Sequence, residues 1–446
     1  MKVIQLLSFF LLIVLTVAAI GEPPAKQLVI AHVTVIDVST GKALPDRNVV
    51  IHGDRITAVG PGPAPIAKGS TVVDGHGKFV IPGLWDMHVH LTATTESALP
   101  LLVATGITSV RDMGGRLMQI DDWRSRIAAG ILVGPHIIRV GPTLNGKSFN
   151  AFQMVPGGPD ATRGAIRALQ FIGVDAIKVY RRLPRDSYFA AADEAKKLGI
   201  PLVGHIPMEV TPAEASDAGQ VTIEHTQTLF EGTFSANLQE AELPAAIEKW
   251  LASSEADALF GKFVRNGTWV TPTLVGYLEM ANLADPSVPR DPRYRYVAAS
   301  QRKEFEPQLK ALSPKDLRAL NGALEDATAR MHRVGVRLLA GTDAAGPRLV
   351  GFSLHQELVE MVKIGKTPAE ALQTATLNPA NALGKTADFG TIEPGRVADL
   401  VMLDGNPLAH IENTQRIAAV VLNGKVYGRP ELNRLLTDAE QLAAQN

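Results

Sequence analysis

The sequence predicts an α/β fold, in which a (β/α)8 TIM barrel carries a small β-sandwich domain built from both ends of the chain. Across the middle of the chain, short apolar runs alternate with amphipathic helical patterns, as expected for a barrel of parallel strands. The segments on either side are instead rich in β-branched residues between Gly, Pro and Asp turns, which is typical of β structure without helices. At 446 residues, the chain exceeds the size of most single cores unless that core is a barrel. An open doubly wound sheet is the alternative that the same alternation allows.

The first 21 residues are expected to be a secretory signal peptide and not part of the fold. Lys2 precedes an apolar run from Val3 to Ile20, and small residues surround a cleavage site expected between Ala19 and Glu22. The run is nearly long enough to span a bilayer, so an uncleaved anchor helix is the alternative. We therefore predict a periplasmic or secreted protein with no membrane association beyond this segment.

The β-sandwich domain is expected to combine residues 22–80 with residues 385–430, where Asn423-Gly424 predicts a hairpin turn. The barrel is expected over residues 81–384 and a helical tail over residues 431–446. The eight candidate barrel strands cover residues 79–91, 107–113, 136–144, 175–180, 201–206, 221–226, 269–275 and 337–344.

A polar stretch over residues 277–333 separates the last two candidate strands and is expected to lie over the barrel mouth. Its second half looks helical, with Ser313 as the N-cap and Pro314 as the first helical residue. Two more helices are expected after the last strand, at residues 354–364 and 368–375.

The composition restricts the partners and the ligands. A net charge of -1 with 20% charged residues gives no electrostatic basis for a nucleic-acid partner. We expect a small-molecule or dipeptide substrate and a homo-oligomeric assembly. Because the chain has no cysteine, any bound metal must be held by nitrogen and oxygen ligands.

Side chains that can bind a metal fall at the ends of the candidate strands, which converge on one site in such a barrel. His88 and His90 end the first strand two positions apart, so they share one face of it. Asp86 shares this face one step deeper and is expected to orient them or to pair along the strand. The fourth, fifth, sixth and eighth strands end in Lys178, His205, His225 and Asp343. A lone histidine on an apolar strand is more often a hydrogen-bonded core residue, but four at strand ends beside an aspartate are hard to explain as packing.

Lys178 lies in the apolar segment "DAIKVY", where an unpaired buried ammonium would be costly. An ammonium would also repel a cation, so this lysine belongs in a metal site only if it is neutralised or converted to a carbamate by CO2. The alternative is an ion pair with Asp175 or Asp343.

Several motifs carry these residues, and they extend over essentially the whole chain after the signal peptide. They are "VIPGLWDMHVHL", "GITSVRDMGG", "DAIKVY", "VGHIP", "TIEHT", "LLAGTDA", "ALQTATLNPANALG" and "GTIEPGRVADLVMLDGNPL". Together they resemble the amidohydrolase superfamily, and within it the imidazolonepropionase-like and Xaa-Pro dipeptidase-like branch.

The resemblance implies two divalent metal ions, expected to be zinc. His88, His90 and Asp343 would hold the more buried ion, His205 and His225 would hold the second, and a Lys178 carbamylated by CO2 would bridge them. The lysine favours the binuclear, peptidase-like branch over the imidazolonepropionases.

The resemblance also implies hydrolysis of an amide C–N bond by a metal-bridging hydroxide, with Asp343 as the catalytic proton shuttle. The expected substrate is a dipeptide or an N-acyl amino acid. Tyr180, Arg181 and His355 are candidate substrate contacts.

One feature of the sequence limits the substrate prediction. The motif "VGHIP" lacks a second histidine that some dipeptide-cleaving relatives carry, which weakens the case for prolidase-like and Arg/Lys-releasing specificities. The alternatives are a cyclic amide or lactone hydrolase with the same metal centre and a non-catalytic metal-binding homologue.

Arg111 and Asp112 lie at the end of the second strand. They are expected to form ordinary surface ion pairs.

Overall fold

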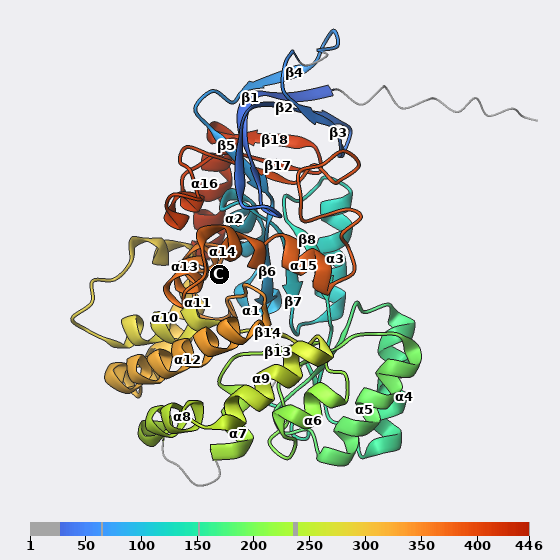
Figure 1. Cartoon of the computed structure of the whole chain (residues 1–446), viewed down its shortest axis with the longest axis vertical. Coiled ribbons are helices and arrows are strands. Elements are labelled where there is room, and N and C mark those ends of the chain that lie inside the picture. The colour runs from blue at the N-terminus through green and yellow to red at the C-terminus, as the bar shows by residue number, and fades with distance from the viewer. Residues whose placement is uncertain (1–26, 64–65, 150–151, 235–239, 446) are drawn as a thin grey trace, which may run out of the picture.

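The computed structural model describes residues 27–63, 66–149, 152–234 and 240–445 (Figure 1). The expected signal peptide lies outside these residues. Every helix within the described ranges is too short or too polar to cross a bilayer.

Strands from both ends of the chain form one eight-stranded sheet at one end of the molecule (Figure 1). These strands are β1 (Gln27–Asp37), β2 (Lys42–His52), β3 (Arg55–Gly60), β4 (Thr71–Asp74), β5 (Phe79–Pro82), β16 (Leu400–Leu403), β17 (Ile417–Leu422) and β18 (Lys425–Gly428). Their order is β18-β17-β16-β5-β1-β2-β3, with β4 paired to β1. The antiparallel pair of β5 and β16 joins the two chain ends, and Ile81 lies opposite Val401. Buried aliphatic side chains such as Val49 and Val421 form a core of this sheet's own.

The hairpin between β17 and β18 confirms the predicted turn. Asn423 has φ 50° and Gly424 has φ 74°. Positive φ at both central residues is the conformation that an Asn-Gly pair adopts most readily, because its twist matches that of the strands.

A second group of strands is entirely parallel. β6 (Leu84–Val89), β7 (Ile107–Asp112) and β8 (His136–Arg139) form one sheet. The other sheet contains β9 (Thr143–Leu144), β10 (Gln153–Met154), β11 (Ile177–Val179), β12 (Leu202–Gly204), β13 (Thr222–Glu224), β14 (Trp269–Thr271) and β15 (Arg337–Leu338). Backbone contacts link the two sheets at both edges. The amide of Asp175 donates to the carbonyl of Arg139 at 2.8 Å, and a parallel bridge joins Val89 to Ala344. The chain that follows β15 therefore lies beside β6.

The predicted first parallel strand, residues 79–91, is in fact two strands that belong to different sheets. β5 pairs with β16, whereas β6 pairs with β7. Gly83 is the residue between β5 and β6. A Cβ atom at Gly83 would lie 2.1 Å from the hydroxyl oxygen of Thr108, so the close approach of these segments requires glycine. The predicted third strand, residues 136–144, is likewise divided into β8 and β9.

Helices alternate with the parallel strands. They are α1 (Leu91–Thr94), α2 (Ala98–Ala104), α3 (Leu117–Ala128), α4 (Pro159–Ile172), α5 (Arg185–Leu198), α6 (Pro212–Asp217), α7 (Thr228–Phe234), α8 (Leu243–Leu251), α9 (Ser254–Asn266), α13 (Phe352–Lys363), α14 (Pro368–Thr374) and α15 (Leu377–Ala382). The helix α4 shows why these segments are helical. Pro159 is its first residue, and Gly173, with φ 83°, ends it. The face that carries Ile166 and Leu169 is buried in the main core.

The stretch between β14 and β15 is helical in both halves and not only in the second. It contains α10 (Leu274–Ala284), η2 (Pro292–Tyr296), α11 (Ala299–Lys310) and α12 (Pro314–Val334). Ser313 caps α12 as predicted, since its side chain accepts a hydrogen bond from the amide of Asp316. The helix α10 packs against both α12 and α13, and Thr273, the residue immediately before it, contacts the predicted ligand His225. After η3 (Ile411–Gln415) and β18, the chain ends in α16 (Arg429–Gln445), which packs against α2.

Candidate metal centre

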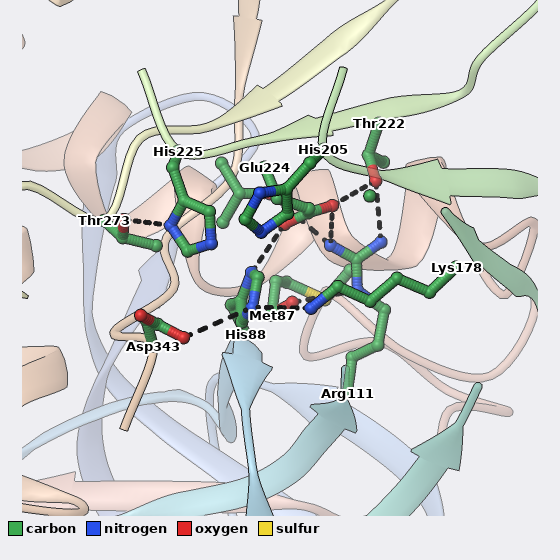
Figure 2. Close-up of polar contacts among 12 residues, drawn as sticks. Met87, His88, Arg111, Lys178, His205, Thr222, Glu224, His225, Thr273 and Asp343 are labelled. Atoms are coloured by element: carbon green, nitrogen blue, oxygen red, sulfur yellow. Dashed lines mark hydrogen bonds and ion pairs between the residues drawn. The ribbon is translucent and has the colours of Figure 1, made fainter. Parts of the chain in front are cut away.

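All six predicted metal ligands lie in one cluster, and Figure 2 labels five of them. They are His88, His90, Lys178, His205, His225 and Asp343. Each one lies on a parallel strand or just after one, so the strand ends deliver them to the same place. His88 is fully buried, and Asp343 is the most accessible of the group with a side chain 23% exposed.

Asp343 lies between the two histidines of the first parallel strand. Its Oδ1 atom is 3.5 Å from Nε2 of His88 and 3.4 Å from Nε2 of His90. His88, His225 and Asp343 each offer a ligand atom, and these atoms all lie within 4.8 Å of one another. The donors are two imidazoles and a carboxylate, a nitrogen and oxygen set that suits zinc and similar divalent ions.

Three of the four histidines are held through Nδ1, which leaves Nε2 directed at the cluster. Nδ1 of His90 lies 3.0 Å from the carbonyl oxygen of Gly114, and Nδ1 of His225 lies 2.7 Å from the hydroxyl of Thr273. Nδ1 of His88 lies 2.9 Å from a carboxylate oxygen of Glu224. A carbonyl or carboxylate can only accept, so Nδ1 of His88 and of His90 carries a proton, and Nε2 is the nitrogen available to a metal.

His205 differs from the other three because neither of its ring nitrogens has a hydrogen-bond partner among the described residues. Its ring is buried between Tyr180 and His225, with ring centroids 4.3 Å and 4.8 Å away. Leaving a buried polar group unsatisfied costs free energy, so a group of this kind needs a partner. A bound cation would provide one.

Burial keeps the imidazoles neutral. It lowers the pKa of His88 and of His205 well below the ordinary value, and it lowers the pKa of His225 to about 4. A neutral imidazole is the form that binds a metal, because protonation occupies the lone pair. The cluster can therefore accept a cation at neutral pH without first losing protons from these rings.

Lys178 lies inside the cluster, with Nζ 3.3 Å from Nε2 of His88. Within the described ranges it forms no ion pair with Asp175 or Asp343, the two partners that were considered as an alternative. Asp175 instead accepts a hydrogen bond from the amide of Arg139 at 2.9 Å. Burial lowers the pKa of Lys178 to about 8, so a minor fraction of the amine is neutral near neutral pH.

Asp343 is held in a left-handed backbone conformation with φ 53°. Arg348 donates to its backbone carbonyl oxygen and to Oδ2. Burial alone would raise the pKa of Asp343, but the charge of Arg348 beside it keeps that pKa well below the ordinary value. His225 and Thr273 also have positive φ, at 67° and 54°. Such conformations are uncommon for residues other than glycine and concentrate at functional sites.

Asp86 orients the first strand of the cluster, as expected. It accepts hydrogen bonds from the amides of His88 and Thr342, both at 3.1 Å, and from the hydroxyl of Thr342 at 2.6 Å. It therefore ties β6 to the segment that carries Asp343. Burial raises the pKa of Asp86 to about 7.

The expectation that Arg111 and Asp112 form surface ion pairs is wrong. Arg111 is 1% exposed, and its Nη2 atom lies 2.7 Å from Oε1 of the buried Glu224. Asp112 is fully buried and accepts hydrogen bonds from the amides of Leu91 and Gly114. The signal for this burial was the apolar context of both residues in "GITSVRDMGG", where a charge needs a buried partner.

The three predicted substrate contacts, Tyr180, Arg181 and His355, do not all lie near the cluster. The ring of Tyr180 lies against His205, and Arg181, the next residue, has Nε 3.3 Å from Oε2 of Glu231. His355 is not brought to the cluster. It is buried on α13, where its two ring nitrogens lie 3.0 Å from the hydroxyl of Thr414 and 2.9 Å from the carbonyl oxygen of Thr105.

The first turn of α10 and Thr273, the residue before it, lie beside the cluster. Thr273, just before α10, contacts His225, and a Cβ atom at Gly276 would lie 3.4 Å from the guanidinium carbon of Arg348. Glu357 on α13 fixes this turn, because its carboxyl oxygens accept from the amides of Leu274 at 3.3 Å and Val275 at 2.8 Å. The sequence alone does not assign these roles to Thr273, Arg348 and Glu357, because the roles depend on contacts between distant segments.

Comparisons with known proteins show the family to which the chain belongs. A family model described as "Amidohydrolase family" matches residues 79–427. The chain is 25% identical over 422 residues to an adenine deaminase of Rubrobacter xylanophilus, an alignment that covers 91% of this chain and 58% of that protein. The chain thus spans little more than half the length of the curated relatives that it matches.

Solved structures with a similar fold include a putative prolidase from Bifidobacterium longum, with a TM-score of 0.70, 24% identity and coverage of 94% of this chain and 100% of that one. Another is a Xaa-Pro dipeptidase with bound methionine in the active site, with a TM-score of 0.69, 23% identity and coverage of 90% and 100%. Because the family model matches more than three quarters of the chain and includes all six clustered residues, this protein belongs to the amidohydrolase family.

Proposed function

We propose that this protein is a metal-dependent hydrolase that cleaves an amide C–N bond in a dipeptide or an N-acyl amino acid. The observation that carries the proposal is the cluster itself, in which four imidazoles, a carboxylate and a lysine of lowered pKa meet at the ends of parallel strands. Membership of the amidohydrolase family supports the reaction class. The substrate class is supported by the names of two similar structures, a putative prolidase and a Xaa-Pro dipeptidase.

The residues present fit a pair of divalent ions, for which zinc is the expected metal. His88, His90 and Asp343 would hold one ion, while His205 and His225 would hold the other. The unsatisfied ring nitrogens of His205 supply an independent reason for a cation on that side. Lys178 would bridge the two after reaction of its neutral amine with CO2. When bound, such ions lower the pKa of water and polarise the carbonyl group of the substrate.

Asp343 is proposed as the residue that moves the proton. Its Oδ1 atom faces His88 and His90, and Arg348 holds its Oδ2 atom. Asp343 would take a proton from the attacking water and deliver it to the leaving nitrogen. Arg348 restrains the carboxylate and favours the ionised form that Asp343 needs before the first transfer, when it accepts the proton.

Recognition of the substrate carboxylate is assigned to the segment after β11. The ring of Tyr180 lies beside His205, and Arg181, the next residue, offers a guanidinium whose Nε is paired with Glu231. A guanidinium can bind a carboxylate through two parallel hydrogen bonds, which suits the free end of a dipeptide or an N-acyl amino acid.

We also propose that the parallel strands form a closed (β/α)8 barrel and that the eight-stranded sheet is a β-sandwich domain. The contacts from Arg139 to Asp175 and from Val89 to Ala344 support closure, because they link the two parallel sheets at both edges. A periplasmic or secreted location remains a proposal that rests on the composition of residues 1–21.

Hydrolytic deamination is the second candidate function. It is favoured by the adenine deaminase of Rubrobacter xylanophilus, whose similarity extends over 91% of this chain. Adenine has no carboxylate, so the guanidinium of Arg181 distinguishes the two candidates. A cyclic amide or lactone hydrolase would use the same cluster and would also need no cation for a carboxylate.

Metal analysis followed by a substrate screen tests the proposal. We expect about two equivalents of metal per chain. We also expect hydrolysis of dipeptides or N-acyl amino acids in preference to lactones and adenine. Ammonia release from adenine alone would favour the deaminase, and turnover of lactones alone would favour the lactonase. Clearly fewer than two equivalents would contradict the binuclear centre, and bound metal without turnover of any of these substrates would favour a non-catalytic homologue.

A further inference from the structure

A line of three buried, polar side chains extends from the cluster into the protein interior (Figure 2). His88 on β6, Glu224 on β13 and Arg111 on β7 have exposed fractions of 0%, 0% and 1%. Only His88 belongs to the predicted ligand set. The other two carry opposite charges in a region where unpaired charge would be very costly, so their presence needs an explanation.

Arg111 is held by residues from three other parallel strands. Its Nε atom donates to the carbonyl oxygen of Met87 at 2.8 Å, and its Nη1 atom donates to the hydroxyl of Thr222 at 3.1 Å. Its Nη2 atom donates to Glu224 at 2.7 Å and lies 3.4 Å from the hydroxyl of Thr271. The guanidinium therefore has a fixed place, and it fixes the carboxylate of Glu224 in turn.

Both carboxylate oxygens of Glu224 accept hydrogen bonds from other side chains. Oε1 accepts from Arg111 and from the hydroxyl of Thr222, while Oε2 accepts from Nδ1 of His88 at 2.9 Å. In a regular strand, Thr222 and Glu224 share a face and the next residue, His225, points to the other side. The left-handed backbone at His225, with φ 67°, allows Glu224 and His225 to serve the same centre from adjacent positions.

We propose that Glu224, held in place by Arg111, is a positioning residue that fixes His88 in the tautomer with the proton on Nδ1. The lone pair of Nε2 then faces Lys178, at 3.3 Å, and Asp343, at 3.5 Å, where a metal ion would bind. A carboxylate behind the ring also makes the imidazole a stronger electron donor. This inference rests on the proposed function only for the identity of the cation, because the tautomer is a property of the metal-free chain.

The variant Glu224→Gln provides a sharp test, since it keeps the shape of the side chain. Arg111 and Thr222 offer hydrogens to Oε1, so the amide would direct its oxygen to them and its NH2 group to His88. Nδ1 of His88 would then have to accept, and the ring proton would move to Nε2. We expect nitrogen NMR of selectively labelled histidine in the metal-free chain to show Nδ1–H for His88 in the parent and Nε2–H in Glu224→Gln.

Zinc binding supplies a second readout. Chelator competition should show a loss of about 10- to 100-fold in zinc affinity for Glu224→Gln. The matched control is Thr226→Val, which removes a buried hydroxyl that contacts Thr328 and leaves the contacts of Glu224 and His88 in place, so its zinc affinity and tautomer should remain those of the parent. If Glu224→Gln fails to fold because Arg111 is left unpaired, Arg111→Met combined with Glu224→Met removes both charges together with the acceptor for Nδ1 of His88, and a loss of zinc affinity is again expected.

The proposal is overturned if Glu224→Gln keeps the parent's zinc affinity and tautomer, if the double variant keeps the parent's zinc affinity, or if Thr226→Val loses as much affinity as Glu224→Gln. A parent chain that binds no zinc would contradict the proposed function instead. In that case the tautomer of His88 in the metal-free protein still decides whether Glu224 positions the ring.

Discussion

Nδ1 of His225 lies 2.7 Å from the hydroxyl oxygen of Thr273, the residue that immediately precedes α10. One proposed ligand is thus held by the segment that the chain inserts between its last two parallel strands. Because Glu357 fixes the first turn of α10, the orientation of His225 depends on the packing of α10 against α13.

We predict that Thr273→Val weakens binding at the metal position proposed for His205 and His225. The substitution keeps the branched shape but removes the oxygen that holds Nδ1 of His225, so the ring can rotate. We expect about a 10-fold loss of metal affinity at that position, measured by competition with a chelator. Thr226→Val is the matched control, because the hydroxyl of Thr226 contacts Thr328 and not a histidine. An equal loss in both variants would contradict a specific role for Thr273.

Asp343→Asn should remove turnover while leaving the fold intact. An amide cannot accept the proton of the attacking water, so we expect kcat/KM to fall by a factor of about 100 to 10,000 for whichever substrate the parent cleaves. Circular dichroism melting in the absence of metal provides the check on folding. Full activity of this variant on such a substrate would exclude Asp343 as the proton shuttle.

The positions of the six clustered residues were accessible from the sequence because they depend on local rules. His88 and His90 are two positions apart on a strand, and the other four follow apolar runs that end at the same face of parallel strands. No contact between distant segments is needed to infer these placements.

The residues that hold the cluster in place were not accessible in the same way. Glu224 precedes a predicted ligand, and regular strand geometry would have pointed it away from the site, whereas the positive φ of His225 removes that restriction. His355 was assigned to the substrate because it follows the last strand closely, but its partners Thr105 and Thr414 come from distant segments. The division of residues 79–91 similarly depends on pairing with β16, which lies more than 300 positions away.

The stability of the protein should depend on the titration of Glu357. Burial raises its pKa in the folded state from 4.5 to about 8. A carboxyl group with a raised folded-state pKa favours the folded state while it is protonated, so its contribution is complete below about pH 4.5 and is lost as the pH rises through about 8. Glu357→Gln cannot ionise and should lack this part of the pH dependence. Urea unfolding at pH 5 and pH 8.5 measures the difference: the parent should lose more stability between the two values than the variant does. Equal losses would mean that Glu357 is ionised in the folded protein at both values.

Metal binding should depend on dissolved CO2 if Lys178 forms the proposed bridge. The amine of Lys178 is buried beside His88, and its lowered pKa of about 8 leaves a neutral fraction that can react with CO2. The product carries a negative charge and two oxygen donors, so it would attract the two cations that the ammonium form repels. We therefore expect metal-free protein prepared in CO2-depleted buffer to bind zinc less tightly, and added bicarbonate to restore the affinity. In Lys178→Met, which has a side chain of similar length that cannot form a carbamate, bicarbonate should have no effect. If bicarbonate changed zinc affinity equally in the parent and in Lys178→Met, the effect would come from another site, and Lys178 would have to act in the cluster as an unmodified amine.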